Sequence, residues 1–224
     1  MDLKTISIPV NNRPDLLARC LASIRACPTW REWRIVFSCE PTSNVAIEHQ
    51  LITTPNAHIS RNSVKLGCWS NTFLACEIAH ALGSDFNLYL EDDLIISSDT
   101  LALCDYFADN AAGVLCLRTP ESRASDKPST LMDIRGGLFG DGFAYHGNQW
   151  PSIRAGWFAA TDNKHLMWDW CLERFLSENA QWRPLVSRSQ NIGLHGTHAA
   201  GEYDPNRHSP CYSGTPVTKF VFSE

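Results

Sequence analysis

The chain has 224 residues, a length that suits one domain with a single large core. Its composition, with 44% hydrophobic residues, 19% charged residues and eight Trp, excludes a disordered chain and a coiled coil. The formal charge of -5 disfavours nucleic-acid binding through a basic surface. No stretch of about 18 uncharged apolar residues occurs, so no transmembrane helix is expected.

The cysteines and the N-terminal sequence indicate the cellular compartment in which the protein would be found. Nine Cys are scattered along the chain without a CxxC pair, which favours reduced, buried thiols over a zinc site or a disulfide framework. The opening "MDLKTISIPV" contains no charged leader, long apolar segment or cleavage site. We therefore expect a cytoplasmic protein.

The first half alternates apolar runs with amphipathic stretches. The runs that predict strands are residues 5–10, 33–40, 57–62, 86–93 and 113–118. The stretches that predict helices are residues 13–27, 43–53, 68–83 and 98–110. Pro14 suits the start of the first helix, and Gly83 suits the end of the third. This alternation predicts an α/β fold, with a mostly parallel sheet flanked by helices and ligands at the carboxyl ends of the strands.

The pattern changes after residue 118. Residues 119–130 form a polar, Pro-containing segment that predicts a surface loop. Residues 135–160 are rich in Gly and aromatic side chains and predict strands, and a helix is expected at about 162–178. Residues 183–210 predict an irregular tail, which could become ordered as a lid when a ligand binds. We expect one domain, 1–224, with a nucleotide-sugar-binding half (1–118) and an acceptor and lid half (119–224) of smaller mixed strands and loops.

Three consecutive acids follow the apolar run "NLYL": Glu91, Asp92 and Asp93. Buried carboxylates are costly unless water, hydrogen bonds or a cation compensate them. Mn²⁺ and Mg²⁺ take oxygen ligands, need only one or two protein carboxylates and bridge to substrate phosphates. On this interpretation Asp93 binds the metal, Glu91 faces a sugar and Asp92 orients the site. The alternative is that the acids face solvent and cap the following turn and helix.

The order of several motifs resembles the inverting β-1,2-N-acetylglucosaminyltransferases, which have the GT-A (Rossmann-like) fold. The motifs are "SIPVNNRPDLLARCLASI", "VFSCE", "YLEDDL", "AGWFAA", "WDW" and "RPLVSRSQNIGLHG". By that resemblance Asp93 is the metal ligand, Glu91 contacts the donor sugar, and Asp169 is the general base. Arg13 and Glu40 would hold the nucleotide, and residues 187–201 would close over donor and metal.

The chain departs from that family in two respects. The family has Trp-Asp-Asp-Trp near the base, whereas this chain has "WDW", with a single acid at Asp169. A membrane anchor and stem, present in the Golgi members, are also not seen. A bacterial or phage enzyme is the expectation that follows.

Other side chains have two possible roles each. Trp168 either forms a platform for a sugar ring or fills the core. Asn71 or Glu77 faces the donor from the third predicted helix, and we choose Asn71. Arg188 clamps a phosphate or ties its loop down with a salt bridge. The candidates His195 and His198 lie among glycines, where they would ligate the metal, bind the diphosphate or simply lie on a surface loop.

Together these features predict a metal-dependent, inverting glycosyltransferase. The donor would be a nucleotide sugar, UDP-linked, with UDP-N-acetylglucosamine as the first guess. The acceptor would be a hydroxyl of a glycan or a small molecule, or a hydroxylated base of phage DNA. Two further alternatives are a nucleotidyltransferase, although "PVNNRPDLL" lacks its Gly-rich basic loop, and a catalytically silent sugar-nucleotide-binding protein.

Overall fold

The computed structural model describes residues 3–119, 127–134, 142–159, 180–193, 195–196, 199–200 and 210–223. Within them a nine-stranded sheet has the order β13-β7-β9-β6-β8-β4-β1-β2-β3. Its first-half strands are β1 (Lys4–Val10), β2 (Trp33–Cys39), β3 (His58–Arg61), β4 (Phe86–Tyr89) and β6 (Val114–Cys116). The others are β7 (Thr130–Ile134), β8 (Phe143–His146), β9 (Gln181–Pro184) and β13 (Val221–Phe222). Both halves of the chain thus contribute to one sheet, although their division of roles stays a prediction.

The sheet is mostly parallel. Strand β1 runs parallel to β2 and β4, and β2 runs parallel to β3. Strand β8 is inserted antiparallel between β4 and β6, and β6 pairs in parallel with β9. The strands β1, β2, β4 and β6 therefore end at the same edge of the sheet. The predicted α/β fold with a mostly parallel sheet flanked by helices is confirmed.

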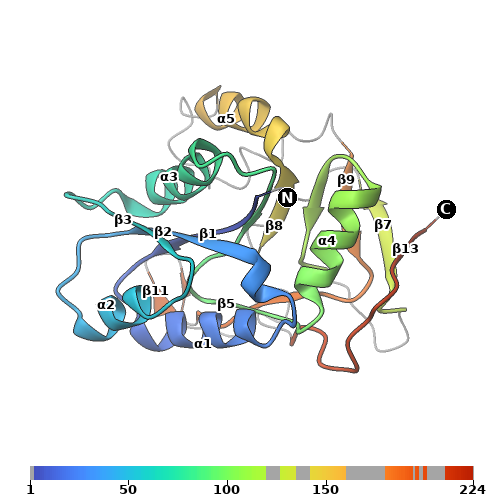
Figure 1. Ribbon diagram of the computed structural model, residues 1–224, viewed down its shortest axis with the longest axis horizontal. Coiled ribbons are helices and arrows are strands. Elements are labelled where there is room, and N and C mark those ends of the chain that lie inside the picture. Colours follow the sequence, from blue (N-terminus) through green and yellow to red (C-terminus); the bar gives the residue numbers. More distant parts are fainter. Residues whose placement is uncertain are drawn as a thin grey trace.

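Helices cover both faces of the sheet (Figure 1). One face carries α1 (Pro14–Arg25), α2 (Val45–Ile52) and α4 (Thr100–Asn110), and the other carries α3 (Gly67–Ala81) and α5 (Trp150–Ala159). The alternation of side chains along β4 explains the two layers: Leu88 packs in the first core, with α1 and α4, and Tyr89 in the second, with α3 and α5. None of the helices in the described part of the chain is long and apolar enough to cross a bilayer.

The predicted elements of the first half are present, with altered ends. Pro14 begins α1, where its missing N–H costs nothing, and Gly83 follows α3 with a φ of 81°. Strand β4 ends at Tyr89, so the prediction of a strand through Asp93 was too long. The acids lie instead in the turn between β4 and β5 (Leu94–Ile96), where the N–H of Leu94 donates to the carbonyl of Glu91.

The prediction of strands over 135–160 was wrong for its last third, because residues 150–159 form α5. Pro151 lies in the first turn, where helices tolerate it. Trp150, Ile153 and Trp157 are spaced as on one face of a helix, and they pack in the core that α5 shares with α3. Short 3₁₀ turns, η1 (Trp30–Glu32) and η2 (Gly147–Gln149), precede β2 and α5. The helix expected at about 162–178 lies outside the described residues.

Residues 183–210 were expected to be irregular, and the described part of this tail is more ordered. Its first residues belong to β9, and β10 (Ser189–Asn191) pairs antiparallel with β5. Two further short strands, β11 (His195–Gly196) and β12 (Ala199–Ala200), pair with each other. The beginning of the predicted lid, residues 187–193, is therefore fixed against the loop that carries the acids, whereas closure over a donor stays a prediction.

Candidate active site

The candidate site lies at the carboxyl edge of the sheet, where α/β proteins bind ligands. Three strands end there, and each is followed by predicted site residues: residues 11–13 after β1, Glu40 after β2, and residues 91–93 after β4. Strands β1 and β4 are neighbours, so their following segments meet although they are far apart in the sequence. The N–H of Asn11 donates to Asp92 Oδ2 at 2.9 Å and joins the two segments.

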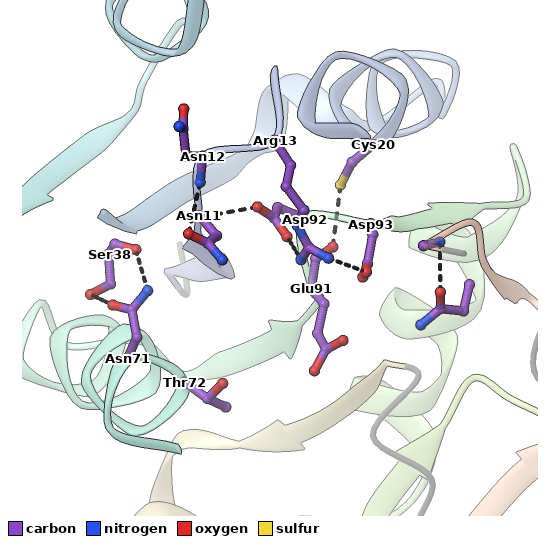
Figure 2. Close-up of polar contacts among 12 residues, drawn as sticks. Asn11, Asn12, Arg13, Cys20, Ser38, Asn71, Thr72, Glu91, Asp92 and Asp93 are labelled. Carbon is purple, nitrogen blue, oxygen red and sulfur yellow. Dashed lines mark hydrogen bonds and ion pairs between the residues drawn. The ribbon is translucent and has the colours of Figure 1, made fainter. Parts of the chain in front are cut away.

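Arg13 forms ion pairs with two of the acids (Figure 2). Its Nη1 lies 2.6 Å from Asp93 Oδ2, and its Nη2 pairs with Asp92 Oδ1. The residue lies at the start of α1, where its carbonyl accepts from the N–H of Leu17.

Asp92 is almost completely buried, with 1% of its surface exposed. Burial raises the pKa of Asp92 to about 6, and the neighbouring charge of Asp93 acts in the same direction. Arg13 and the N–H of Asn11 oppose this rise by stabilising the carboxylate. Ionisation of Asp92 is therefore unfavourable in the folded chain, and Arg13 compensates its cost only in part.

Asp93 has the properties of a metal ligand. It is 5% exposed, and its Oδ1 is buried without a hydrogen-bond partner among the described residues, while Oδ2 contacts Arg13. An unpartnered buried carboxylate oxygen fits a divalent cation, which prefers such ligands. No cluster of three His, Cys, Asp or Glu suited to a metal exists among the described residues. A cation here would therefore depend on Asp93 together with ligand oxygens, as Mg²⁺ and Mn²⁺ sites at phosphates commonly do.

The two residues that follow β10, Ile192 and Gly193, close the other side of Asp93. The N–H of Ile192 donates to the Asp93 carbonyl at 2.9 Å, and Gly193 lies directly beside the carboxylate. A Cβ at position 193 would come within 2.1 Å of Asp93 Oδ2. Only glycine lets the backbone approach this closely.

Glu91 points away from Arg13, towards the side where Thr72 lies (Figure 2). The hydroxyl of Tyr89 donates to Glu91 Oε1 at 3.3 Å and lies 3.1 Å from the hydroxyl of Thr72. Burial raises the pKa of Tyr89 well above its ordinary value, and the charge of Glu91 contributes. The phenol consequently remains a hydrogen-bond donor to Glu91.

Two predicted donor-binding residues have structural partners. Both oxygens of Glu40 accept backbone N–H groups at the start of α3, with the shortest bond, 2.7 Å, from Gly67. Asn71 is 2% exposed and bonds Ser38 through both ends of its amide, at 2.6 Å and 3.1 Å. Each side chain therefore fixes α3 against β2, and a contact of either one with a nucleotide stays a prediction. Glu77 faces α5 instead, where it pairs with Arg154.

Arg188 has the second of its two predicted roles, that of tying down its loop. The side chain is fully buried, and its Nε and Nη2 bond the two carboxylate oxygens of Asp99 at 2.9 and 3.1 Å. It also donates to the carbonyls of Val186 and Pro128 and stacks over Tyr212. The structure thus provides no support for the phosphate clamp.

The remaining predicted residues cannot be placed as side chains. Asp169, Trp168 and His198 lie outside the described residues. Of His195 only the backbone is described, paired with Ala200. Their roles stay predictions.

Comparison of the whole fold with known structures identifies its type. It resembles residues 1–349 of Staphylococcus aureus TarS in complex with UDP-GlcNAc, with a TM-score of 0.63 and 14% identity. It also resembles the mannosyltransferase PcManGT from Pyrobaculum calidifontis in complex with GDP-Man and Mn²⁺, with a TM-score of 0.51 and 18% identity. The chain has a GT-A fold. No family model and no curated protein matches the sequence.

The alignments with these structures cover most of this chain but only part of each known structure. The TarS alignment covers 91% of this chain and 62% of TarS 1–349, and the PcManGT alignment covers 68% and 46%. The chain therefore spans less than two thirds of either structure. At 14% and 18% identity, the similarity establishes the GT-A fold and not the substrate.

Several residues of this GT-A site were not singled out from the sequence. Asn11, Tyr89 and Gly193 contact the acids, and Asp99 anchors Arg188. Gly193 and Asn11 lie within the motifs "RPLVSRSQNIGLHG" and "SIPVNNRPDLLARCLASI", so their position beside predicted site residues was a usable indication. Tyr89 had none, because a buried aromatic residue in a strand is ordinary core material.

Proposed function

We propose that the chain is a metal-dependent glycosyltransferase that transfers a sugar from a nucleotide sugar to an acceptor hydroxyl. The observation that carries the proposal is Asp93: a buried carboxylate with an unpartnered oxygen, at the carboxyl edge of a GT-A sheet. A UDP-linked donor is the first candidate, and UDP-N-acetylglucosamine the first sugar to test. The mannosyltransferase with GDP-Man among the structural neighbours makes a guanine nucleotide the necessary comparison.

The reaction would be a direct displacement with inversion. The acceptor oxygen forms a bond to the anomeric carbon, and Asp169 takes the proton of the acceptor hydroxyl. The bond between the anomeric carbon and the diphosphate oxygen breaks at the same time, and its electron pair leaves with the nucleoside diphosphate. Asp93 would hold Mn²⁺ or Mg²⁺, which supplies Lewis-acid stabilisation of the diphosphate when bound. Glu91, held by Tyr89, would accept hydrogen bonds from the sugar. Trp168, His195 and His198 are the further proposed contacts with the donor.

A panel of nucleotide sugars with Mn²⁺ tests this proposal by thermal shift and by release of nucleoside diphosphate. We expect one donor to stabilise the fold and to be hydrolysed slowly without an acceptor. Asp93→Ala should abolish the shift, and Asp169→Ala should keep binding but lose turnover by about 100-fold or more. Asp109→Ala is the matched control, because Asp109 is an exposed acid on α4.

Three results would reject the proposal or its assignments. If no nucleotide or nucleotide sugar shifts the melting temperature with Mn²⁺, the glycosyltransferase function is wrong. A donor that is bound equally by Asp93→Ala would remove the metal role from Asp93. Release of pyrophosphate in place of a nucleoside diphosphate would indicate a nucleotidyltransferase.

A further inference from the structure

Two acids of the candidate site share one cation that the chain itself provides. Arg13 pairs with Asp92 through one terminal nitrogen and with Asp93 through the other. The carboxylates are buried, whereas 28% of the Arg13 side chain is exposed. The acids are therefore enclosed more completely than the cation that pairs with them.

The position of Arg13 is fixed by the backbone around it. Its N–H donates to the carbonyl of Asn11 at 2.9 Å, and Pro14 begins α1 immediately afterwards. The N–H of Asn11 in turn bonds Asp92. The same short segment thus positions the guanidinium and one of its two partners, so the pairing is part of the local fold.

Two polar atoms in this cluster are buried and have no hydrogen-bond partner in the part of the chain that the structure describes: Asp93 Oδ1 and Arg13 Nε. The first is an acceptor suited to a cation, and the second is a donor suited to an anionic oxygen. A cation alone would satisfy Asp93 Oδ1 but would approach the positive guanidinium. A cation that carries a phosphate would satisfy both atoms, because the phosphate oxygen can accept from Arg13.

We infer that Arg13 is an internal counter-cation of the Asp92–Asp93 pair, which makes the site take up a divalent cation together with a nucleoside diphosphate. This inference rests on the proposed function and adds an energetic coupling to it. Arg13 weakens the binding of the free cation by repulsion. It strengthens binding of the cation–diphosphate complex by pairing with the phosphate. Arg13 is then a residue that determines specificity for the complex over the free metal.

Calorimetric titration with Mn²⁺, in the absence and presence of UDP or GDP, measures this coupling without turnover. In the unmodified chain we expect the diphosphate to tighten Mn²⁺ binding by about 10-fold or more. Arg13→Gln should bind free Mn²⁺ about 10-fold more tightly, and most of the tightening by diphosphate should disappear. Arg13→Lys keeps the charge, so its affinity for free Mn²⁺ should stay within about 3-fold of the original value.

Arg61→Gln is the matched control for charge. Arg61 is half-exposed and pairs with Glu48, so both Mn²⁺ constants should be unchanged. The inference is overturned if Arg13→Gln binds free Mn²⁺ no more tightly than the unmodified chain or keeps the full effect of the diphosphate. If Arg13→Gln does not fold, a 10-fold gain of free Mn²⁺ affinity in Arg13→Lys overturns it equally. Failure of the unmodified chain to bind Mn²⁺ with any diphosphate rejects the proposed function itself.

Discussion

The guanidinium of Arg188 and the carboxylate of Asp99 form a doubly bonded ion pair that is closed off from solvent, with side-chain exposures of 0% and 1%. The pair connects β10 to the start of α4, and Asp99 Oδ2 also accepts the N–H of Val217. Three distant segments of the chain therefore meet at Asp99. This pair stabilises the segment that leads to Gly193 and the acids.

Removal of one partner should destabilise the fold strongly. We expect Arg188→Met to lower the free energy of unfolding by about 3–5 kcal/mol, because it leaves Asp99 buried without its cation. Chemical denaturation followed by tryptophan fluorescence measures the change. Arg61→Gln, which breaks an exposed pair, should cost no more than about 1 kcal/mol. Equal losses in the two variants would contradict the structural role of Arg188.

Gly193→Ala tests the close approach of the backbone to Asp93. The added Cβ would overlap Asp93 Oδ2, so the carboxylate or the backbone at Gly193 must move. We expect Mn²⁺ affinity in the presence of UDP to fall by about 10-fold or more. Gly83→Ala is the control: its φ of 81° makes the substitution strained, but nothing lies near its Cβ and the metal affinity should not change. Similar affinities of the two variants would argue against Gly193 as a support of the site.

Stability should depend on pH through Asp92. The folded-state pKa is about 6, compared with an ordinary value of 3.8, so the folded chain holds this proton more tightly than the unfolded chain does. The resulting stabilisation is fully present below about pH 4 and is lost as the pH rises through 6, a change of about 3 kcal/mol.

The variant Asp92→Asn isolates this contribution. The difference in unfolding free energy between it and the original chain should change across pH 4–6 in the stated direction. Asp109→Asn, which alters an exposed acid, provides the reference titration. A flat difference between the original chain and Asp92→Asn would show that burial does not raise the pKa of Asp92.

Tyr89 should act on the donor only through Glu91. Tyr89→Phe removes the hydrogen bond to Glu91 Oε1 while it keeps the ring in the core. We expect the KM for the nucleotide sugar to rise by about 5- to 10-fold, with a smaller change in kcat. The control is Tyr145→Phe, because that phenol is equally buried but bonds Asn87, remote from the acids. A rise of KM in both variants would indicate a general packing effect.

Thiol reactivity should separate Cys68 from the buried cysteines. Cys68 is exposed in the first turn of α3, whereas burial raises the pKa of Cys76 to about 11. At pH 7.5 N-ethylmaleimide should therefore modify Cys68 well before Cys76, as peptide mass mapping would reveal. Cys68→Ser should lack the modification of the α3 peptide. Modification of Cys76 at the same rate in the folded chain would contradict the structure.

Prediction of structure from the sequence succeeded best where a single physical cause determines the local structure. Strands and helices of the first half follow from hydrophobic period and from Pro14 and Gly83, and the acids lie at the sheet edge where parallel topology requires them. The segment 150–159 was mistaken for strand because aromatic and glycine residues suit either structure, and its helical period became decisive only against α3. Arg13 could be named but not paired with Asp92 and Asp93, since that contact depends on the order of strands β1 and β4.

The hydrogen bond from Ile192 to Asp93, together with the β5–β10 ladder, has a consequence for synthesis of the chain. During translation the acids emerge long before the segment that closes around them, so the proposed metal site cannot be completed on a half-made chain. Such long-range pairing forms late in folding. A nascent chain that ended before Ile192 would lack the backbone that closes around Asp93, and binding of Mn²⁺ with diphosphate should appear only when Ile192 and Gly193 have left the ribosome.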